Sequence, residues 1–296
     1  MVRNADLLYF PIKASIQSIL PLVDEYIVAL GNGDIDDRTK QIIESIPSPK
    51  IKIYPRVWPE SSFKESRIFA EETNFALSKC TGDWCFYLQA DEVVHEADYD
   101  SILKAINEND QRPEVDGLLF KYFHFWGDYD HYLPFHGWYK NEIRLFKSNR
   151  KVYSIKDAQS FRKGQNQKLS VTEIDARIFH YGWVRPPSVM QTKKKEHEGF
   201  HHGRATAEEM FSSLGNNFDY GPLGRIPRFD GTHPEVMREW IKKLDWKDEL
   251  NFSNSGKPLR PLHKHEMWKY RLLSHFEKQF LRGRSFFGYS NWKILE

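Results

Sequence analysis

The chain has 296 residues and carries 43 Lys and Arg against 41 Asp and Glu, a formal net charge of +2. This near balance excludes the strongly basic surface that is typical of proteins that bind nucleic acid. No apolar stretch approaches the roughly 18 residues of a membrane-spanning helix, and no signal peptide precedes residue 10. Its two cysteines, Cys80 and Cys85, do not form a disulfide framework, and we expect a cytoplasmic protein.

Strand-like and helix-like segments alternate over the first two thirds of the sequence. In chain order, the pattern predicts a helix over 11–23, a strand over 26–30, a helix over 37–46, a strand over 51–54, a helix over 64–79, a strand over 84–88, a helix over 98–108, and strands over 117–123, 142–147 and 177–181. Residues 1–4 resemble only the end of a strand, so we expect an incomplete first strand. This order predicts an α/β fold with a mostly parallel sheet flanked by helices.

The pattern changes after Pro186, where Gly/Pro/Asn-rich loops join helical segments. Helices are predicted near 188–198, 204–214, 234–244 and 263–281. We therefore expect two parts, an α/β domain over residues 1–185 and a mainly helical C-terminal extension over residues 186–296 that packs on it.

Asp91 and Glu92 follow the apolar run 84–88, which reads as a buried strand. An acidic pair at the end of a buried strand is costly unless a cation meets it. In an open α/β sheet, ligands bind at the carboxyl ends of the strands, so a divalent metal with a phosphorylated substrate would suit this place. The alternative is a strand that ends in a solvated acidic turn.

Five segments in chain order carry a wider pattern. They are Arg3-Asn4, the acidic loop Gly31-Asn32-Gly33-Asp34-Ile35-Asp36-Asp37-Arg38-Thr39, the helix from Arg67 to Asn74, Gly82-Asp83-Trp84 leading to Gln89-Ala90-Asp91-Glu92, and Phe179-His180-Tyr181-Gly182-Trp183. Together they resemble glycosyltransferase family 2, whose members have the nucleotide-sugar-binding GT-A fold. The resemblance covers roughly residues 2–185.

The resemblance implies a metal-dependent, inverting transfer of a sugar from a nucleotide sugar to a hydroxyl of a glycan or a lipid-linked acceptor, at the inner membrane surface. It assigns Asp91 and His180 to a Mn²⁺ or Mg²⁺ ion. The donor contacts that it implies are Arg3, Asn4, Gly31, Asp34, Asp36, Arg67, Asn74 and Gln89. Gln89 departs from the family, which has an Asp there, and an amide adds no charge to the metal site.

Several of these residues also have simpler interpretations. Asp36 or Asp37 is suited to an ordinary helix N-cap. Arg67 can pair with Glu71 one helical turn later. His180 alone would be read as a histidine at a strand end, and only the resemblance favours the metal.

Transfer needs a carboxylate that takes the proton of the acceptor hydroxyl. Our candidate is Asp157, which follows the strand over 142–147, because the resemblance places an acidic residue near this point. Asp128 and Asp130 are the rivals. Each of these two rivals is equally suited to a turn in which the carboxylate bonds its own backbone.

Aromatic residues gather in two places. Over 120–139 they alternate with His, Asp and Gly, which favours a platform for a sugar acceptor over pure packing. In the tail, basic residues lie among aromatic ones, which suits contact with anionic lipid, although helix packing is the favoured explanation. The basic residues are Arg271, Lys278, Arg282 and Arg284, and the aromatic ones are Phe276, Phe280, Phe286 and Phe287.

Two other functional classes stay open. A non-catalytic protein that binds sugar nucleotides or glycans is favoured by Gln89 and by the incomplete first strand. The segment His197-Glu198-Gly199-Phe200-His201 fits the His-Glu-x-x-His pattern of zinc metalloproteases, but that pattern needs a helix through Gly199 and a third ligand.

Overall fold

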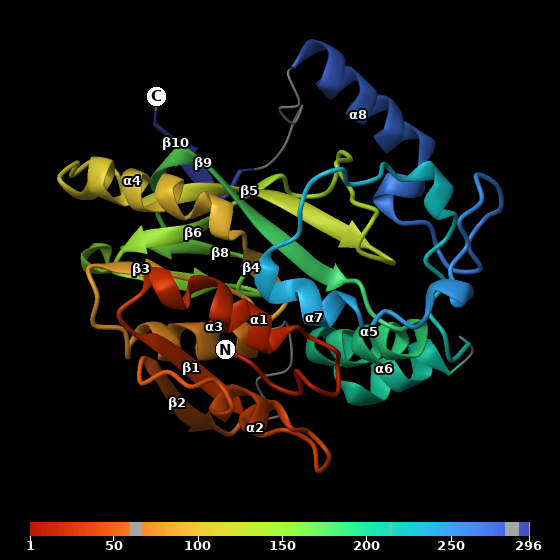
Figure 1. Cartoon of the computed structure of the whole chain (residues 1–296), viewed down its shortest axis with the longest axis horizontal. Helices are drawn as coiled ribbons and strands as arrows, with labels where there is room; N and C mark the ends of the chain where they lie inside the picture. The colour runs from red at the N-terminus through yellow and green to blue at the C-terminus, as the bar shows by residue number, and fades with distance from the viewer. Residues whose placement is uncertain (60–66, 213–214, 282–289, 296) are drawn as a thin grey trace.

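The computed structural model describes residues 1–59, 67–212, 215–281 and 290–295. Its strands form sheets with helices on both sides, so the predicted α/β architecture is confirmed (Figure 1).

The smaller sheet pairs β1 (Tyr26–Gly31) with β2 (Ile51–Arg56) in parallel, from Tyr26 opposite Ile51 to Gly31 opposite Arg56. Val2 adds a single parallel bridge to Leu30, in line with the short first strand that the sequence predicts. Helices α1 (Ile12–Ile19) and α2 (Thr39–Glu44) cover this sheet. Their buried faces meet β1 in one apolar cluster that includes Val2, Ile12, Ile16, Val28 and Ile43.

The larger sheet has the strand order β10-β9-β5-β6-β3, with β4 paired to β9. Its strands are β3 (Trp84–Phe86), β4 (Glu92–Val94), β5 (Gly117–Trp126), β6 (Asn141–Lys147), β9 (Leu169–Trp183) and β10 (Trp292–Ile294). β9 runs parallel to β5 and to β10, whereas the β3–β6, β5–β6 and β4–β9 pairs are antiparallel. The sheet is therefore mixed.

Side-chain alternation divides the interior of the larger sheet between its two faces. Leu118 and Phe120 of β5 pack with Ile102 of α4 (Tyr99–Asp110). Leu119, between them, points to the other face and packs with Phe161 of the hairpin β7 (Val152–Ile155) and β8 (Ser160–Lys163). Helix α3 (Arg67–Leu77) lies against β7 and β1.

β1 and β3 do not pair in the part of the chain that the structure describes. A cavity of about 540 Å³ lies between them, with Tyr26 and Val28 on one wall and Trp84, Phe86 and Leu88 on the other. The two sheets are thus separate at this point.

The residues after Pro186 form α5 (Pro187–His202), α6 (Arg204–Phe211), α7 (Arg238–Ile241) and α8 (Trp268–Phe280). The helix predicted over 234–244 is shorter, a 3-10 turn over Glu235–Met237 followed by the single turn α7.

The C-terminal part is joined to the α/β part by a shared core. Trp246 and Tyr220 lie in one apolar cluster with Trp126 and Tyr181. In addition, β10 adds a strand to the larger sheet. Of the helices described, none combines the length and apolar character needed to cross a membrane.

Candidate functional site

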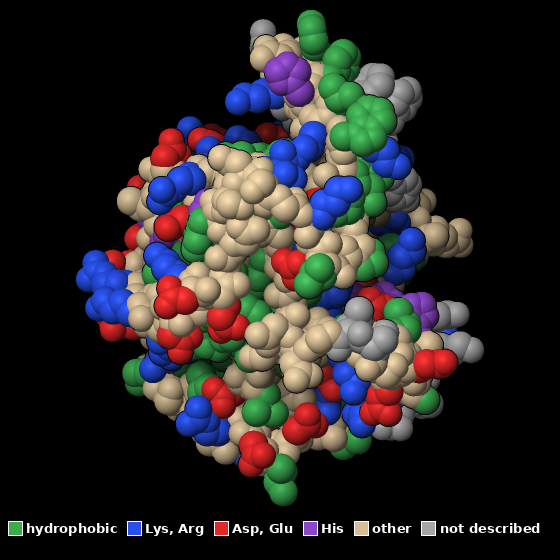
Figure 2. Space-filling model, turned by 90° about the vertical axis from the view of Figure 1, so that its right-hand side faces the viewer, with side chains coloured by type: hydrophobic (Ala, Val, Ile, Leu, Met, Phe, Trp, Pro, Cys, Tyr) green, Lys and Arg blue, Asp and Glu red, His purple; other side chains and the backbone are tan. Residues whose placement is uncertain are grey.

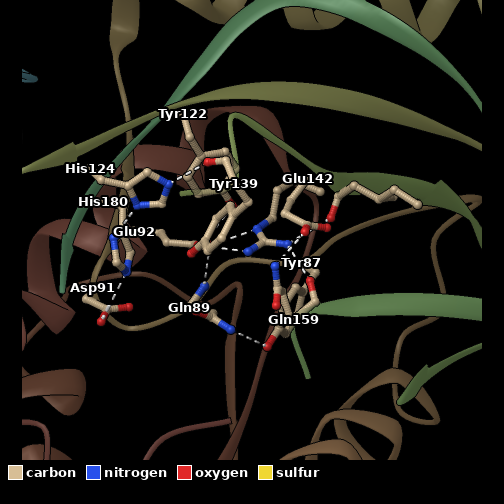
Figure 3. A network of polar contacts seen from close by, with 12 residues as sticks. Tyr87, Gln89, Asp91, Glu92, Tyr122, His124, Tyr139, Glu142, Gln159 and His180 are labelled. Atoms are coloured by element: carbon tan, nitrogen blue, oxygen red, sulfur yellow. Dashed lines mark hydrogen bonds and ion pairs between the residues drawn. The ribbon is translucent and has the colours of Figure 1, made fainter. Parts of the chain in front are cut away.

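The carboxyl end of β3 leads to Asp91, and the sheet brings His180 beside it. β4 pairs with β9 so that Glu92 lies opposite His180, and β5 pairs with β9 so that His124 lies opposite His180 as well. Figure 3 shows the side chains of Asp91, His180 and His124 next to one another at one end of a polar network. Glu142 and Gln159 lie at its other end.

Asp91 and His180 face each other in a largely buried position. Nε2 of His180 lies 3.7 Å from Oδ2 of Asp91, and each residue is 7% exposed. Gly182 leaves the space beside both groups open, because a Cβ atom there would lie 2.5 Å from that Nε2 and 2.6 Å from that Oδ2. The structure thus brings together the two residues predicted to bind a metal.

A chain of hydrogen bonds sets the tautomer of His180. Nε2 of His124 lies 2.7 Å from the carbonyl oxygen of Tyr139, which only accepts, so this nitrogen carries the proton. Burial lowers the pKa of His124 well below its usual value, and its Nδ1 therefore accepts from Nδ1 of His180 at 3.0 Å. Burial also lowers the pKa of His180. Neutral His180 consequently presents the lone pair of Nε2 to the Asp91 carboxylate.

Two cations complete the surroundings of Asp91. Nζ of Lys193, on α5, lies 3.8 Å from Oδ2 of Asp91 and donates to the Gly182 carbonyl at 2.8 Å. The buried Arg185 donates to the same carbonyl at 3.0 Å. Burial opposes ionisation of Asp91, but attraction to Lys193, to Arg185 and to His180 when that ring is protonated outweighs it and lowers its pKa. Burial, with repulsion from Arg185, lowers the pKa of Lys193 to about 7.

A second polar cluster lies at the carboxyl end of β1. Nη2 of Arg3 donates to Asp34 at 2.7 Å, and the Asn4 side chain both donates to the Asp34 carboxylate and accepts from its backbone N–H, each at 2.9 Å. Nη1 of Arg3 also lies 3.8 Å from Glu196 of α5. Because Lys193 is on the same helix, α5 borders both clusters. Three predicted donor contacts are thus in one place.

The other predicted donor contacts are less constrained. Gly31 lies against the Trp58 ring, where a Cβ atom would be 2.7 Å from Nε1. Asp36 and Arg67 are exposed. Nε2 of Gln89 donates to the Tyr87 hydroxyl at 3.2 Å.

Asn74 has a different role from the one predicted. Its Oδ1 accepts from the backbone N–H of Ser154 at 2.7 Å, and its Nδ2 donates to the Ser154 carbonyl at 3.1 Å. The amide side chain of Asn74 thus holds β7 against α3. Because both of its polar atoms make these hydrogen bonds, they are not left for a nucleotide sugar.

The three candidate bases lie in different environments. Asp128 is fully buried and accepts hydrogen bonds from His131 Nδ1 and from the backbone N–H groups of Asp130 and His131, so its carboxylate caps a turn. Asp130 lies 3.6 Å from Arg228 at the surface. Asp157 is exposed in the turn between β7 and β8.

The aromatic residues over 120–139 are mainly packing residues. Trp126 and Tyr129 are buried in the cluster that joins the two parts of the chain. Trp126 stacks on Trp183 with ring centroids 4.9 Å apart. The prediction of an open acceptor platform is therefore wrong for these two residues, since their ring faces already contact protein.

His197, Glu198 and His201 all lie within α5, which continues through Gly199 to His202. The rings of His197 and His201 are 4.6 Å apart. Across residues 1–59, 67–212, 215–281 and 290–295, no group of three or more His, Cys, Asp or Glu residues could hold a metal ion. The third zinc ligand that a metalloprotease needs is thus missing from this part of the chain.

Sequence reasoning missed two residues of the network. Arg144 pairs with Glu92 through bonds of 2.6 and 2.9 Å, and His124 fixes the His180 tautomer. The signal for both is a polar residue in an apolar strand, since Arg144 interrupts Ile143-Leu145 and His124 interrupts Phe123-Phe125.

Neither the known protein-family models nor the curated proteins contain a match to this chain.

Proposed function

We propose that this protein is a metal-dependent, inverting glycosyltransferase that moves a sugar from a nucleotide sugar to a hydroxyl of a glycan or lipid-linked acceptor. The observation that supports this proposal most strongly is the pairing of Asp91 with His180. A carboxylate and an imidazole lone pair, 3.7 Å apart, both only accept, so a cation between them would relieve their repulsion.

The donor set fits Mn²⁺, and Mg²⁺ with more water. Asp91 supplies an oxygen and His180 a nitrogen, and diphosphate oxygens and water would complete the coordination. The bound ion would supply positive charge for the diphosphate leaving group. Gly182 leaves room beside both ligands.

The chain's own residues supply the rest of the donor site. Lys193 and Arg185 place positive charge near Asp91, where the diphosphate would lie. The Arg3, Asn4 and Asp34 cluster, which α5 borders through Glu196, is our site for the nucleoside. Gly31, Asp36, Arg67 and Gln89 stay predicted contacts around it.

Asp157 is our candidate base. Its exposed carboxylate can meet an acceptor hydroxyl, and inversion needs one base on the face opposite the leaving group. Asp130 is the rival that remains, because the turn occupies Asp128.

Binding without turnover is the second candidate. Gln89 supports it, since its amide bonds Tyr87 and adds no charge to the metal. Under this alternative the same residues would hold a sugar nucleotide that is not hydrolysed.

A thermal-shift panel of UDP- and GDP-sugars, with and without Mn²⁺, tests the proposal. We expect one donor to raise Tm only with Mn²⁺, and Asp91→Ala to abolish that increase. Asp175→Ala is the matched control, because this carboxylate lies at the surface. Retained Mn²⁺-dependent affinity in Asp91→Ala would refute the ligand assignment.

Turnover separates the two candidates. A transferase hydrolyses the bound donor slowly with Mn²⁺, whereas a pure binding protein does not. Asp157→Asn should keep donor binding and lose about 10²–10⁴ in transfer rate. Near-normal rates in this variant would move the base to Asp130.

A further inference from the structure

Helix α8 exposes a row of large apolar side chains. Trp268, Leu272, Phe276 and Phe280 are each between 40% and 74% exposed. Their spacing of four residues places them along one side of the helix. α8 stands at the edge of the molecule in Figure 1, and hydrophobic side chains gather at the same end in Figure 2.

The opposite side of α8 holds the helix to the protein through polar groups. Glu277 is fully buried, and its carboxylate accepts from His136 at 2.6 Å and from Lys140 at 2.7 Å. Ser274 accepts from the backbone N–H of His136 at 2.7 Å. The usual arrangement is thus inverted, with polar groups inside and apolar groups outside. Packing against the described residues leaves Trp268, Leu272 and Phe280 more than half exposed, so the helix packing favoured from the sequence does not account for these three.

The charged side chains at the surface of α8 are all positive. Lys269, Arg271 and Lys278 are its Lys and Arg residues, and Glu277, its only carboxylate, is buried against partners. Next to the helix lies a cavity of about 280 Å³ whose lining includes Arg225, Lys257, Trp268 and Arg271, together with one carboxylate, Glu266, which pairs with Arg260.

We infer that α8 docks on the surface of a bilayer that contains anionic lipids. The apolar row would enter the boundary between head groups and acyl chains, and the basic residues would meet the lipid phosphates. Charge complementarity favours this partner over a second copy of the chain, because two such helices would bring like charges together. The inference rests on α8 alone and not on the proposed transfer.

Docking would also place the candidate site near the membrane. His136 and Lys140, which bond Glu277, flank Tyr139, whose carbonyl accepts from His124. A lipid-linked acceptor would therefore be reached at the surface on which α8 lies.

Vesicle co-sedimentation of the full chain tests the inference, with phosphatidylcholine vesicles that contain or lack phosphatidylglycerol. We expect binding only with phosphatidylglycerol, and weaker binding as salt is raised. The triple variant Leu272→Ser, Phe276→Ser, Phe280→Ser should bind at least about tenfold more weakly. Its control is Met210→Ser with Phe252→Ser, two exposed residues outside α8, which should bind like the natural chain.

A charge variant gives an independent measurement. Lys269→Glu with Lys278→Glu should lose binding, whereas Lys40→Glu with Lys104→Glu, at exposed sites on α2 and α4, should keep it. Three results would overturn the inference: no sedimentation of the natural chain, equal binding to vesicles without phosphatidylglycerol, or a dimer in light scattering that the triple variant dissociates.

The outcome is separable from the proposed function. The triple variant should retain the Mn²⁺-dependent thermal shift with a nucleotide sugar, because its three positions are on the outer side of α8. Loss of vesicle binding with donor binding intact supports the inference, and loss of donor binding in Asp91→Ala leaves vesicle binding unchanged.

Discussion

Asp91 and Glu92 are adjacent in the sequence but belong to two different regions. Both oxygens of Glu92 are bonded by Arg144, at 2.6 and 2.9 Å, and the Tyr122 hydroxyl donates to it at 2.8 Å. Asp91 instead has Nε2 of the neutral His180 ring at 3.7 Å and Nζ of Lys193 at 3.8 Å. Neighbouring residues point to opposite sides of an extended chain. One carboxylate is therefore satisfied within the fold, and we propose that the other is left for a ligand.

Substitutions in the two regions should have different effects on the stability of the fold. A buried ion pair is expensive to break, because removing one partner leaves the other charged and desolvated. A carboxylate that is kept for a ligand is held near other charges without close partners, so its removal costs the fold little. Variants on the two sides should therefore separate stability from binding.

The largest effect is expected for Arg144→Met. Glu92 and Arg144 are both fully buried, so this change should lower the free energy of unfolding by about 3–5 kcal/mol. Urea denaturation followed by circular dichroism measures it. Asp91→Asn should change the same quantity by less than about 1 kcal/mol.

The double variant Glu92→Gln with Arg144→Met is the control for Arg144→Met. It removes both charges and should recover part of the lost stability. A double variant no more stable than Arg144→Met would show that packing, and not the uncompensated carboxylate, is the cause.

Glu142, on the Arg144 side of the network, gives the next effect. Burial raises its pKa to about 7. Its Oε1 accepts from Gln159 Nε2 at 2.8 Å, whereas its Oε2 has no hydrogen-bond partner among the described residues. Because the pKa is raised in the folded state, the folded protein is favoured when Glu142 is protonated. This contribution to the free energy of unfolding is fully present below the ordinary pKa near 4.5, and it is lost as the pH rises through 7.

Glu142→Gln should remove this pH dependence. The natural chain should lose about 3 kcal/mol relative to the variant between pH 4.5 and pH 8. Denaturation curves of both proteins across this range measure the difference. A constant difference would mean that Glu142 titrates near its ordinary pKa.

Although the strand predicted over 177–181 is only part of β9, the periodicity of the sequence predicts most of the elements in chain order. It could not predict how the strands pair, because pairing depends on contacts between distant segments. The short strands β4 and β10, which pair with distant residues, were missed for the same reason, and the local hairpin of β7 and β8 was missed as well. β10 pairs with residues more than 100 positions earlier in the chain.

The candidate site shows the same limit. Asp91, His180 and the Arg3, Asn4 and Asp34 cluster were predicted from motifs, and each set does come together. The partners that define their chemistry, His124 and Arg144, come from strands whose register the sequence does not reveal. Asn74 was misassigned because its partner is backbone, which no side-chain motif records.

Gly182→Ala tests whether the space beside Asp91 and His180 holds the metal, because the added methyl group would enter that space. The added Cβ would lie within 2.6 Å of both proposed ligands, and Gly182 does not have a positive φ, so the backbone tolerates alanine. We expect Mn²⁺ affinity in the presence of the nucleotide sugar to fall about 100-fold, or about 2.7 kcal/mol, by calorimetry. Gly215→Ala, with no atom within 4 Å, is the matched control. Equal affinities would move the metal away from this space.

The smallest effect is expected for His124→Phe, which keeps the ring packing against Tyr139 and removes the hydrogen bond to His180. Without this acceptor, the proton of His180 can move to Nε2, and the lone pair no longer has a fixed place. Loss of such a partner lowers metal affinity by at least about tenfold, or about 1.4 kcal/mol. His202→Phe, at an exposed site, should leave the affinity unchanged. Because His124 is not a proposed ligand, a full loss of binding would instead mean that the strand pairing around His180 had been disturbed, which circular dichroism of the variant would detect.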